Sequence, residues 1–197
     1  LLPDVTPALT AALPGLEIVW SEDKTPTLLQ EVEEGRLDAA ILALDDRVEA
    51  LAHVTIGVDE FVLAAPAGNP LVRPRRPGSP EVLDGETVLL VDDGDCFREQ
   101  ALALCGAGGA READLRATGL STLVQMVAAG GGVTLLPSLA LDVENRRGQL
   151  RVRSFRSPAP SRTLVLAWRK GSARRQALEA VGTVVRKAAP LQRRRAT

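Results

Sequence analysis

Residues 115–137 read LRATGLSTLVQMVAAGGGVTLLP, and strand and helix patterns alternate within this one stretch. The first three residues predict a short strand, Leu115–Ala117. Apolar residues at helical spacing then predict a helix over Leu120–Ala129, which three glycines end. The apolar residues after them predict a strand over Gly132–Leu136. Such alternation predicts an α/β fold.

The rest of the chain continues this alternation on both sides of that stretch. Thr25 looks like a helix N-cap, with Pro26 at the first helical position. The nearly continuous apolar run Leu37–Leu44 is typical of a strand that is covered on both faces in a parallel sheet. Further strands are expected at 16–20, 54–58, 61–65, 87–91, 150–155 and 163–168, further helices at 2–13, 95–105 and 172–187, and a proline-rich surface loop at 67–80.

The composition of the chain limits its partners. Its 197 residues, with 45% hydrophobic residues, can bury a core in one or two domains. The 24 Lys and Arg against 25 Asp and Glu give a net charge of −1, so the chain itself has no electrostatic footprint for DNA or an anionic membrane. Apolar runs such as Ala39–Leu44 are too short to span a membrane, and no secretory signal is visible, which predicts a cytoplasmic protein. The start at Leu1, without an initiator Met, predicts a fragment of a longer protein.

No metal and no cofactor is expected. Two cysteines and one histidine, His53, do not supply the four ligands of a structural zinc site. A chain of this size also needs no disulfide to hold it together, so a pairing of the cysteines would be regulatory. The basic tail 193–195 is expected to be a solvated terminus.

Both cysteines lie in the segment GDCFREQALALC, residues 94–105, nine residues apart. On one helix this spacing places Cys96 and Cys105 roughly 13.5 Å apart along the axis and on opposite faces. A disulfide needs Cα atoms within about 7 Å. Forming one here therefore requires the helix to unwind, and the glycines after Cys105 supply slack for that change.

The environment of Cys96 favours two opposite outcomes. A position at a helix N-terminus favours a thiolate, and Arg98 is near enough in sequence to assist. Three neighbouring carboxylates oppose a second negative charge, those of Asp92, Asp93 and Asp95. A plainer interpretation is that Cys96 caps the helix and Cys105 is an ordinary buried small residue. The spacing alone leaves both interpretations open.

The segment 94–105 closely resembles the redox helix of the OxyR-like, peroxide-sensing branch of the LysR-type transcription regulators. The resemblance continues through Leu115–Thr118, Met126–Pro137, Gly35–Leu44 and Trp168–Ser172, and it covers essentially the whole chain. It implies two Rossmann-like lobes of the periplasmic-binding-protein kind, with the chain crossing between them twice. Lobe I would hold residues 1–59 and 167–197, and lobe II would hold residues 60–166 with the redox helix.

The resemblance also implies roles for individual residues. Cys96 would be the peroxide-reactive cysteine and Cys105 the resolving thiol, which condenses with a sulfenic acid on Cys96. Thr25 and Gln100 would line the peroxide pocket, and Arg162 would stabilise the thiolate by its charge. Plainer alternatives are a simple helix cap for Thr25 and a surface ion pair for Arg162.

The chain departs from the family pattern at Asp95, where the family commonly has histidine. An imidazole donates a hydrogen bond to a thiolate or a peroxide, whereas an ionised carboxylate only accepts one and raises the pKa of a neighbouring thiol. Asp95 is assigned to the peroxide pocket by this resemblance, and its carboxylate leaves the rate of peroxide sensing open, though not the fold. The family's first strand, with another pocket threonine, would lie before Leu1, as would its winged helix-turn-helix and linker helix.

The leading hypothesis is a non-enzymatic regulatory domain whose effector is hydrogen peroxide. It would form homodimers, and tetramers in the full-length protein, would bind DNA through the N-terminal domain that this chain lacks, and would not contact a membrane. One alternative is a LysR-type effector domain that binds a small anion or metabolite between its lobes, with incidental cysteines. A thiol peroxidase using Cys96 and a periplasmic binding protein are further alternatives, although the chain has no common hydrolase, phosphate-loop or zinc-protease motif.

Overall fold

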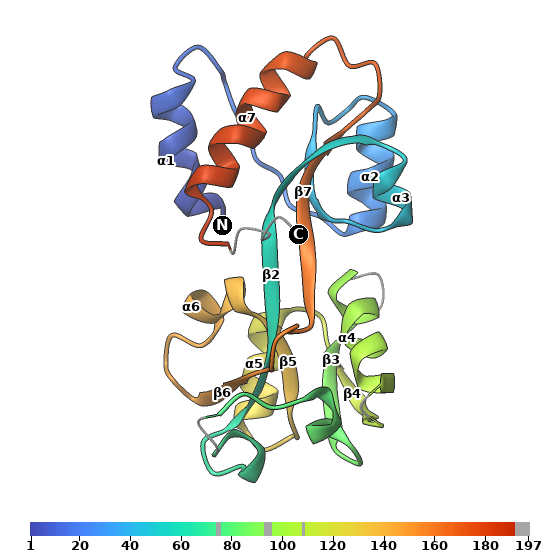
Figure 1. The fold of residues 1–197 in the computed structure, drawn as a ribbon, viewed down its shortest axis with the longest axis vertical. Helices are drawn as coiled ribbons and strands as arrows, with labels where there is room; N and C mark the ends of the chain where they lie inside the picture. The colour runs from blue at the N-terminus through green and yellow to red at the C-terminus, as the bar shows by residue number, and fades with distance from the viewer. Residues whose placement is uncertain (74–75, 93–95, 108, 192–197) are drawn as a thin grey trace. The chain divides into compact units, whose positions relative to one another are not determined.

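The computed structural model describes residues 1–73, 76–92, 96–107 and 109–191, apart from the side chains of Cys96 and Ala107. The chain divides into two compact units. Unit 1 holds Leu1–Asp59 and the chain from Arg162 onward, and unit 2 holds Glu60–Ser161. The chain therefore passes from one unit to the other twice, along the strands β2 (Ala52–Pro66) and β7 (Ser161–Trp168) (Figure 1).

Unit 1 is a small sheet covered by helices. Its strands lie in the order β1–β7–β2, and β1 pairs with β7 in antiparallel register, Ala40 opposite Ala167. Figure 1 shows α1 beside α7, and the two helices are in contact. The elements are α1 (Leu2–Ala12), α2 (Thr25–Glu33), β1 (Ala40–Ala43), α3 (Asp46–Glu49), the first half of β2 (Ala52–Pro66), β7 (Ser161–Trp168) and α7 (Arg175–Ala188).

The packing of unit 1 follows from its apolar periodicity. On α2, Leu29 and Val32 lie on one face and are buried against β1 and β7. On α7, a Cβ atom built at Gly182 would lie 2.3 Å from Cγ2 of Val54, so a glycine is required where this helix meets β2. Burial of these apolar faces supplies most of the stability of such a layer, at about 25 cal/mol for each Å² removed from water.

Unit 2 contains an antiparallel sheet and a parallel strand pair. The second half of β2 pairs with β5 on one side and β6 on the other, both antiparallel. Strands β3 and β4 are parallel, with α4 between them in the chain. The elements are η1 (Pro70–Val72), η2 (Pro80–Leu83), β3 (Thr87–Val91), α4 (Cys96–Ala107), β4 (Arg111–Ala117), α5 (Leu120–Ala128), β5 (Thr134–Pro137), η3 (Ser138–Ala140), α6 (Leu141–Glu144) and β6 (Leu150–Ser154).

The glycines between α5 and β5 allow the antiparallel sheet of unit 2 to approach the parallel strand pair closely. Gly132 has a φ of +135°, and a Cβ atom built on it would lie 2.6 Å from the carbonyl oxygen of Thr87. Only glycine combines that backbone conformation with so close an approach. The next residue, Val133, therefore bridges to Val88 of β3 and donates its N–H to Thr87.

The α/β class predicted from the sequence is confirmed, but several details differ. The segment 16–20 forms no strand: the side chain of Val19 is 84% exposed, so nothing holds the segment against a sheet. The run around β1 is antiparallel to its neighbour, because a continuous apolar run reports burial on both faces and not strand direction. The strands expected at 54–58 and 61–65 are one strand, β2. The loop expected at 67–80 contains the short helix η1.

No helix within the described ranges is long and apolar enough to cross a membrane. The basic tail 193–195 lies outside the described residues.

Candidate functional site

Helix α4 runs without interruption from Cys96 to Ala107, so both cysteines belong to one helix. An intact helix separates them by roughly 13.5 Å along its axis, which is too far for a disulfide. Cys105 is accordingly a free thiol. Asp95, predicted to belong to the peroxide pocket, lies outside the described residues, and so does the side chain of Cys96.

Cys105 lies on the buried face of α4. Phe97, Ala101 and Cys105 recur every four residues, which places them on one side of a helix, and each is at most 5% exposed. The ring of Phe97 packs against that of Phe61 on β2, with centroids 5.5 Å apart. The Cys105 thiol is therefore part of the core of unit 2.

Burial, and to a smaller extent the nearby carboxylate of Glu112, raises the pKa of the Cys105 thiol to about 11. Both effects disfavour the charged thiolate. Because the thiolate is the nucleophilic form, Cys105 is held in its unreactive, protonated form at neutral pH while α4 is folded.

This shift predicts a loss of stability at high pH. The folded thiol keeps its proton up to about pH 11, whereas the unfolded thiol loses it above its ordinary value of 9.0. Stability is therefore full below pH 9 and falls as the pH rises through that window, by about 1–2 kcal/mol after allowance for partial solvation. Urea unfolding of the reduced chain at pH 8 and pH 10.5 measures the fall. A Cys105→Ala variant should lack this component, and an equal fall in the variant would contradict the assignment.

Arg98, on the same helix, is 6% exposed and is held by β3 and β4. Its guanidinium donates to the carbonyl oxygen of Val91 at 3.2 Å and to Oε1 of Glu112 at 2.7 Å. The same Glu112 oxygen lies 3.3 Å from Nε of Arg116. Arg98, which the sequence suggested as an aid to the Cys96 thiolate, thus joins α4 to the neighbouring strands through Glu112.

Gln100 has one unusual atom. Its Oε1 is buried and has no hydrogen-bond partner in the described part of the chain. A buried carbonyl oxygen without a partner costs roughly 1–3 kcal/mol. The side chain therefore offers an acceptor to any ligand that brings an O–H or N–H group to it.

Arg162 lies in unit 1, at the start of β7, and forms a buried ion pair. Its Nε and Nη2 atoms each lie 3.0 Å from Oδ2 of Asp59. The Asp59 side chain is fully buried and that of Arg162 is 16% exposed. The surface ion pair considered from the sequence is thus an internal one. Sequence reasoning missed Asp59, although a charged residue within the apolar run of β2 is a signal that could have identified it.

Thr25 also lies in unit 1 and is 8% exposed. It is the first residue of α2 and not its cap: the N-cap is Lys24, and no side chain caps this helix end. The prediction that Thr25 caps the helix is therefore wrong by one position, because Pro26 is tolerated anywhere in the first turn. A role for its hydroxyl in a peroxide pocket stays a prediction.

The predicted site residues are thus divided between the units. Thr25 and Arg162 belong to unit 1, and Gln100 and Cys105 belong to unit 2, on the helix that begins at Cys96. Sequence reasoning missed Glu112, because the strand that contains it, READLRA, has no apolar pattern from which its contacts with other elements could be predicted. Among the described residues, no group of three or more His, Cys, Asp and Glu could hold a metal ion.

A family model described as the LysR substrate binding domain matches residues 1–190. A hydrogen peroxide-inducible genes activator of Haemophilus influenzae is 40% identical over 186 residues, which cover 94% of this chain and 62% of that protein. The DNA-binding transcriptional dual regulator OxyR of Escherichia coli K12 is 38% identical over 187 residues, covering 94% of this chain and 61% of that protein. The chain therefore spans about three fifths of the length of these relatives.

Solved structures of similar proteins have the same fold. The reduced form of OxyR superimposes with a TM-score of 0.86 at 36% identity, covering 95% of this chain and 88% of that one. The oxidized form of OxyR gives a TM-score of 0.84 at 38% identity, covering 95% of this chain and 89% of that one. Both forms match over nearly the whole chain.

Proposed function

Since the chain belongs to the LysR substrate-binding domain family and, within it, to the OxyR-like regulatory domains, we propose that it senses hydrogen peroxide for a DNA-binding transcription factor. The signal would be a disulfide between Cys96 and Cys105 that remodels α4 and the oligomer. The observation that carries this proposal is the placement of both cysteines on one helix, with Cys105 on its buried face, because their pairing then requires a change of structure.

The proposed chemistry has two steps. The Cys96 thiolate attacks one oxygen of hydrogen peroxide, the O–O bond breaks, and the released hydroxide takes up a proton to become water. The sulfur of Cys105 then attacks the sulfenic sulfur of Cys96. The S–S bond forms, the S–O bond breaks, and the proton lost by Cys105 leaves with the hydroxyl as a second water. Two thiols and one peroxide thus give one disulfide and two waters.

The burial of Cys105 fits the second step. While α4 is folded, the raised pKa of Cys105 keeps it protonated. Unwinding of α4 exposes the thiol to water, which lowers its pKa towards the ordinary value and increases the thiolate fraction. The resolving cysteine would thus become reactive only when the helix opens. Gly109, which follows α4, has a φ of +69°, a backbone conformation that glycine adopts without strain.

The peroxide pocket is proposed to draw on Thr25, Gln100 and Arg162, with Asp95 beside the reactive cysteine. Gln100 supports this assignment, because its buried oxygen is an acceptor for a peroxide O–H group. Asp95 in the place of the family's histidine would make the first step slower than in relatives that have the imidazole.

The remaining features are proposals for the whole protein. We propose that this domain forms homodimers and that the full-length protein forms tetramers. We also propose a cytoplasmic location, because disulfides in that compartment are transient and serve signalling. DNA would be bound by a part of the full-length protein outside this chain. The changed shape of α4 would alter subunit packing and, through it, the contacts with DNA.

A count of free thiols tests the proposal. One equivalent of hydrogen peroxide should lower the count of the reduced chain from two to zero, as measured with a thiol reagent after denaturation. A Cys105→Ser variant should lose its one thiol to a sulfenic acid that dimedone traps. An unchanged count of two would refute the switch and favour a LysR-type domain that responds to a small molecule without redox chemistry. Sustained peroxide consumption with a reductant would instead indicate a thiol peroxidase.

A further inference from the structure

Unit 2 has a surface pocket of about 370 Å³ that lies apart from α4. Its polar walls come from Ser121 and Gln125 on α5 and from Glu144, Arg146, Arg147 and Gln149 on α6 and the turn after it. We call it the arginine pocket. We propose that it binds a small oxyanion, the carboxylate or phosphate group of a small molecule, between Arg147 and the amides of Gln125 and Gln149.

The charges of the arginine pocket favour an anion. The lining includes two arginines and one glutamate, and the Oε2 atom of Glu144 already accepts a hydrogen bond of 2.6 Å from the hydroxyl of Ser121. Neither Arg146 nor Arg147 forms an ion pair with any residue in the described ranges. A guanidinium offers several N–H donors in one plane, which suits the paired oxygens of a carboxylate or phosphate.

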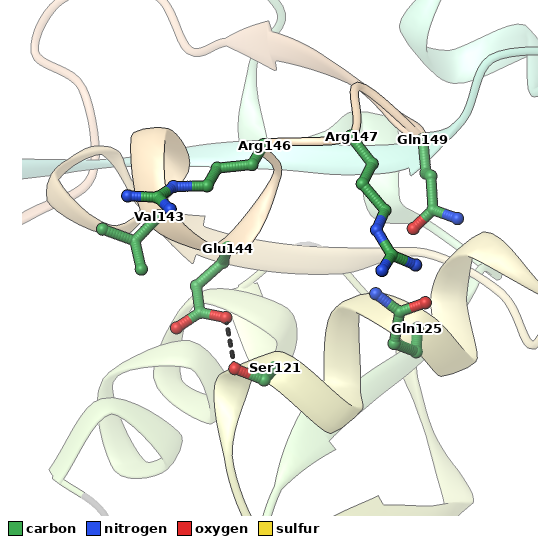
Figure 2. A pocket seen from close by; sticks show the side chains of 7 residues that line it. All are labelled: Ser121, Gln125, Val143, Glu144, Arg146, Arg147 and Gln149. Atoms are coloured by element: carbon green, nitrogen blue, oxygen red, sulfur yellow. Dashed lines mark hydrogen bonds between the residues drawn. The ribbon is translucent and has the colours of Figure 1, made fainter.

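The geometry brings neutral donors to the same place. Figure 2 shows the guanidinium of Arg147 and the amide of Gln125 reaching toward one another, with the amide of Gln149 beside them. Arg146 extends the other way, towards Val143, where a small apolar part of a ligand would find contact. An amide NH₂ group donates a hydrogen bond to an oxyanion without adding charge. One arginine and two amides therefore form a binding site with several donors for a small oxyanion.

The turn that carries the two arginines is held in place. Asn145 accepts from the N–H of Leu150 at 3.1 Å and donates to its carbonyl oxygen at 2.9 Å, and the N–H of Gly148 donates to the carbonyl oxygen of Asn145 at 2.8 Å. Gly148 has a φ of +61°, a conformation that glycine adopts without strain. The bond between Ser121 and Glu144 fixes α6 to α5. Because this backbone is already ordered, less conformational entropy is lost when a ligand binds.

Isothermal titration of the reduced chain with inorganic phosphate and, separately, with citrate tests the proposal at constant ionic strength. We expect saturable binding of at least one probe at one site per chain. Binding of phosphate alone would indicate a phosphate-ester ligand, and binding of citrate alone a carboxylic acid. An Arg147→Gln variant should bind at least about tenfold more weakly, since a charge-assisted hydrogen bond is lost.

The matched control is Arg151→Gln, an exposed arginine on β6 that does not line the pocket. It should bind within about twofold of the parent, and both variants should unfold at the same urea concentration as the parent, because both side chains are exposed. Absence of saturable binding for both probes would overturn the proposal, as would equal affinities in the parent and Arg147→Gln. Neither result depends on the cysteines, so the peroxide proposal is tested separately.

Discussion

Replacing Arg98 with glutamine should make the reduction potential of the proposed Cys96–Cys105 disulfide more negative by roughly 40 mV. Arg98 holds α4 against β3 through a hydrogen bond to the carbonyl oxygen of Val91 and against β4 through a partly buried contact with Glu112 at 2.7 Å. Removing one partner of a buried ion pair costs several kcal/mol, and we take about 2 kcal/mol because the Glu112 side chain is 28% exposed. If oxidation unwinds α4 and breaks this contact, only the reduced form loses that energy. For a two-electron couple, about 1.4 kcal/mol corresponds to 30 mV.

Equilibration with glutathione buffers measures the potential, and urea unfolding of the reduced chain measures the stability. The matched control is Arg116→Gln, which removes a second and more exposed partner of the same Glu112. An exposed pair contributes at most about 1 kcal/mol, so this variant should shift the potential by less than about 20 mV. An Arg98→Gln chain that is less stable when reduced but has the parent's potential would show that the ion pair survives oxidation, and α4 would then not unwind there.

Replacing Arg162 with glutamine should lower the stability of the chain by about 3 kcal/mol. The carboxylate of Asp59 is fully buried, and Arg162 contacts it with two nitrogens at 3.0 Å. Losing one partner leaves a buried charge without its ion pair, which typically costs about 3–5 kcal/mol. For a chain of this length, about 3 kcal/mol corresponds to roughly 6–12 °C in Tm. Calorimetry of the variant measures the shift.

A double-mutant cycle with Asp59→Asn supplies the control. Because the two side chains interact directly, the double variant should be less destabilised than the sum of the single variants. If the losses of stability in the two single variants simply add up in the double variant, a direct pairing would be contradicted. Each residue would then stabilise the chain through its other contacts.

The same two variants test whether Arg162 supports the Cys96 thiolate. In a Cys105→Ser background, the pH profile of Cys96 alkylation reports its pKa. If the Arg162 charge stabilises the thiolate, Arg162→Gln should move this profile to higher pH, whereas Asp59→Asn, which keeps the arginine and removes a negative charge, should not. Identical profiles in both variants would assign Arg162 a structural role only.

Some of this site could be predicted from the sequence. The helix that carries both cysteines begins and ends within two residues of its expected bounds, because capping and apolar periodicity are local properties. The spacing of the cysteines excluded a disulfide within an intact helix, since the rise of a helix per residue is fixed. The resemblance to the OxyR-like branch rests mainly on the two cysteines and this same helix.

Other parts could not be predicted from the sequence. The direction of β1, the single long strand β2 and the exposed segment at 16–20 depend on which distant strand each segment meets. Glu112 lies 14 residues beyond Arg98, and Asp59 lies 103 residues before Arg162, so no local pattern links the partners of either pair.

The sequence by itself determined the fold class and the helix with its two cysteines, because periodicity and spacing are properties of short segments. The candidate residues for the cysteine chemistry came from the resemblance of the sequence to a known family. Only the tertiary structure decided how the charges are used. It placed Arg98 on Glu112 and Arg162 on Asp59, and it buried Cys105 so that its pKa rises to about 11. The physical reason is that electrostatic energies depend on distance and burial in space, and the folded chain sets both by bringing distant segments together.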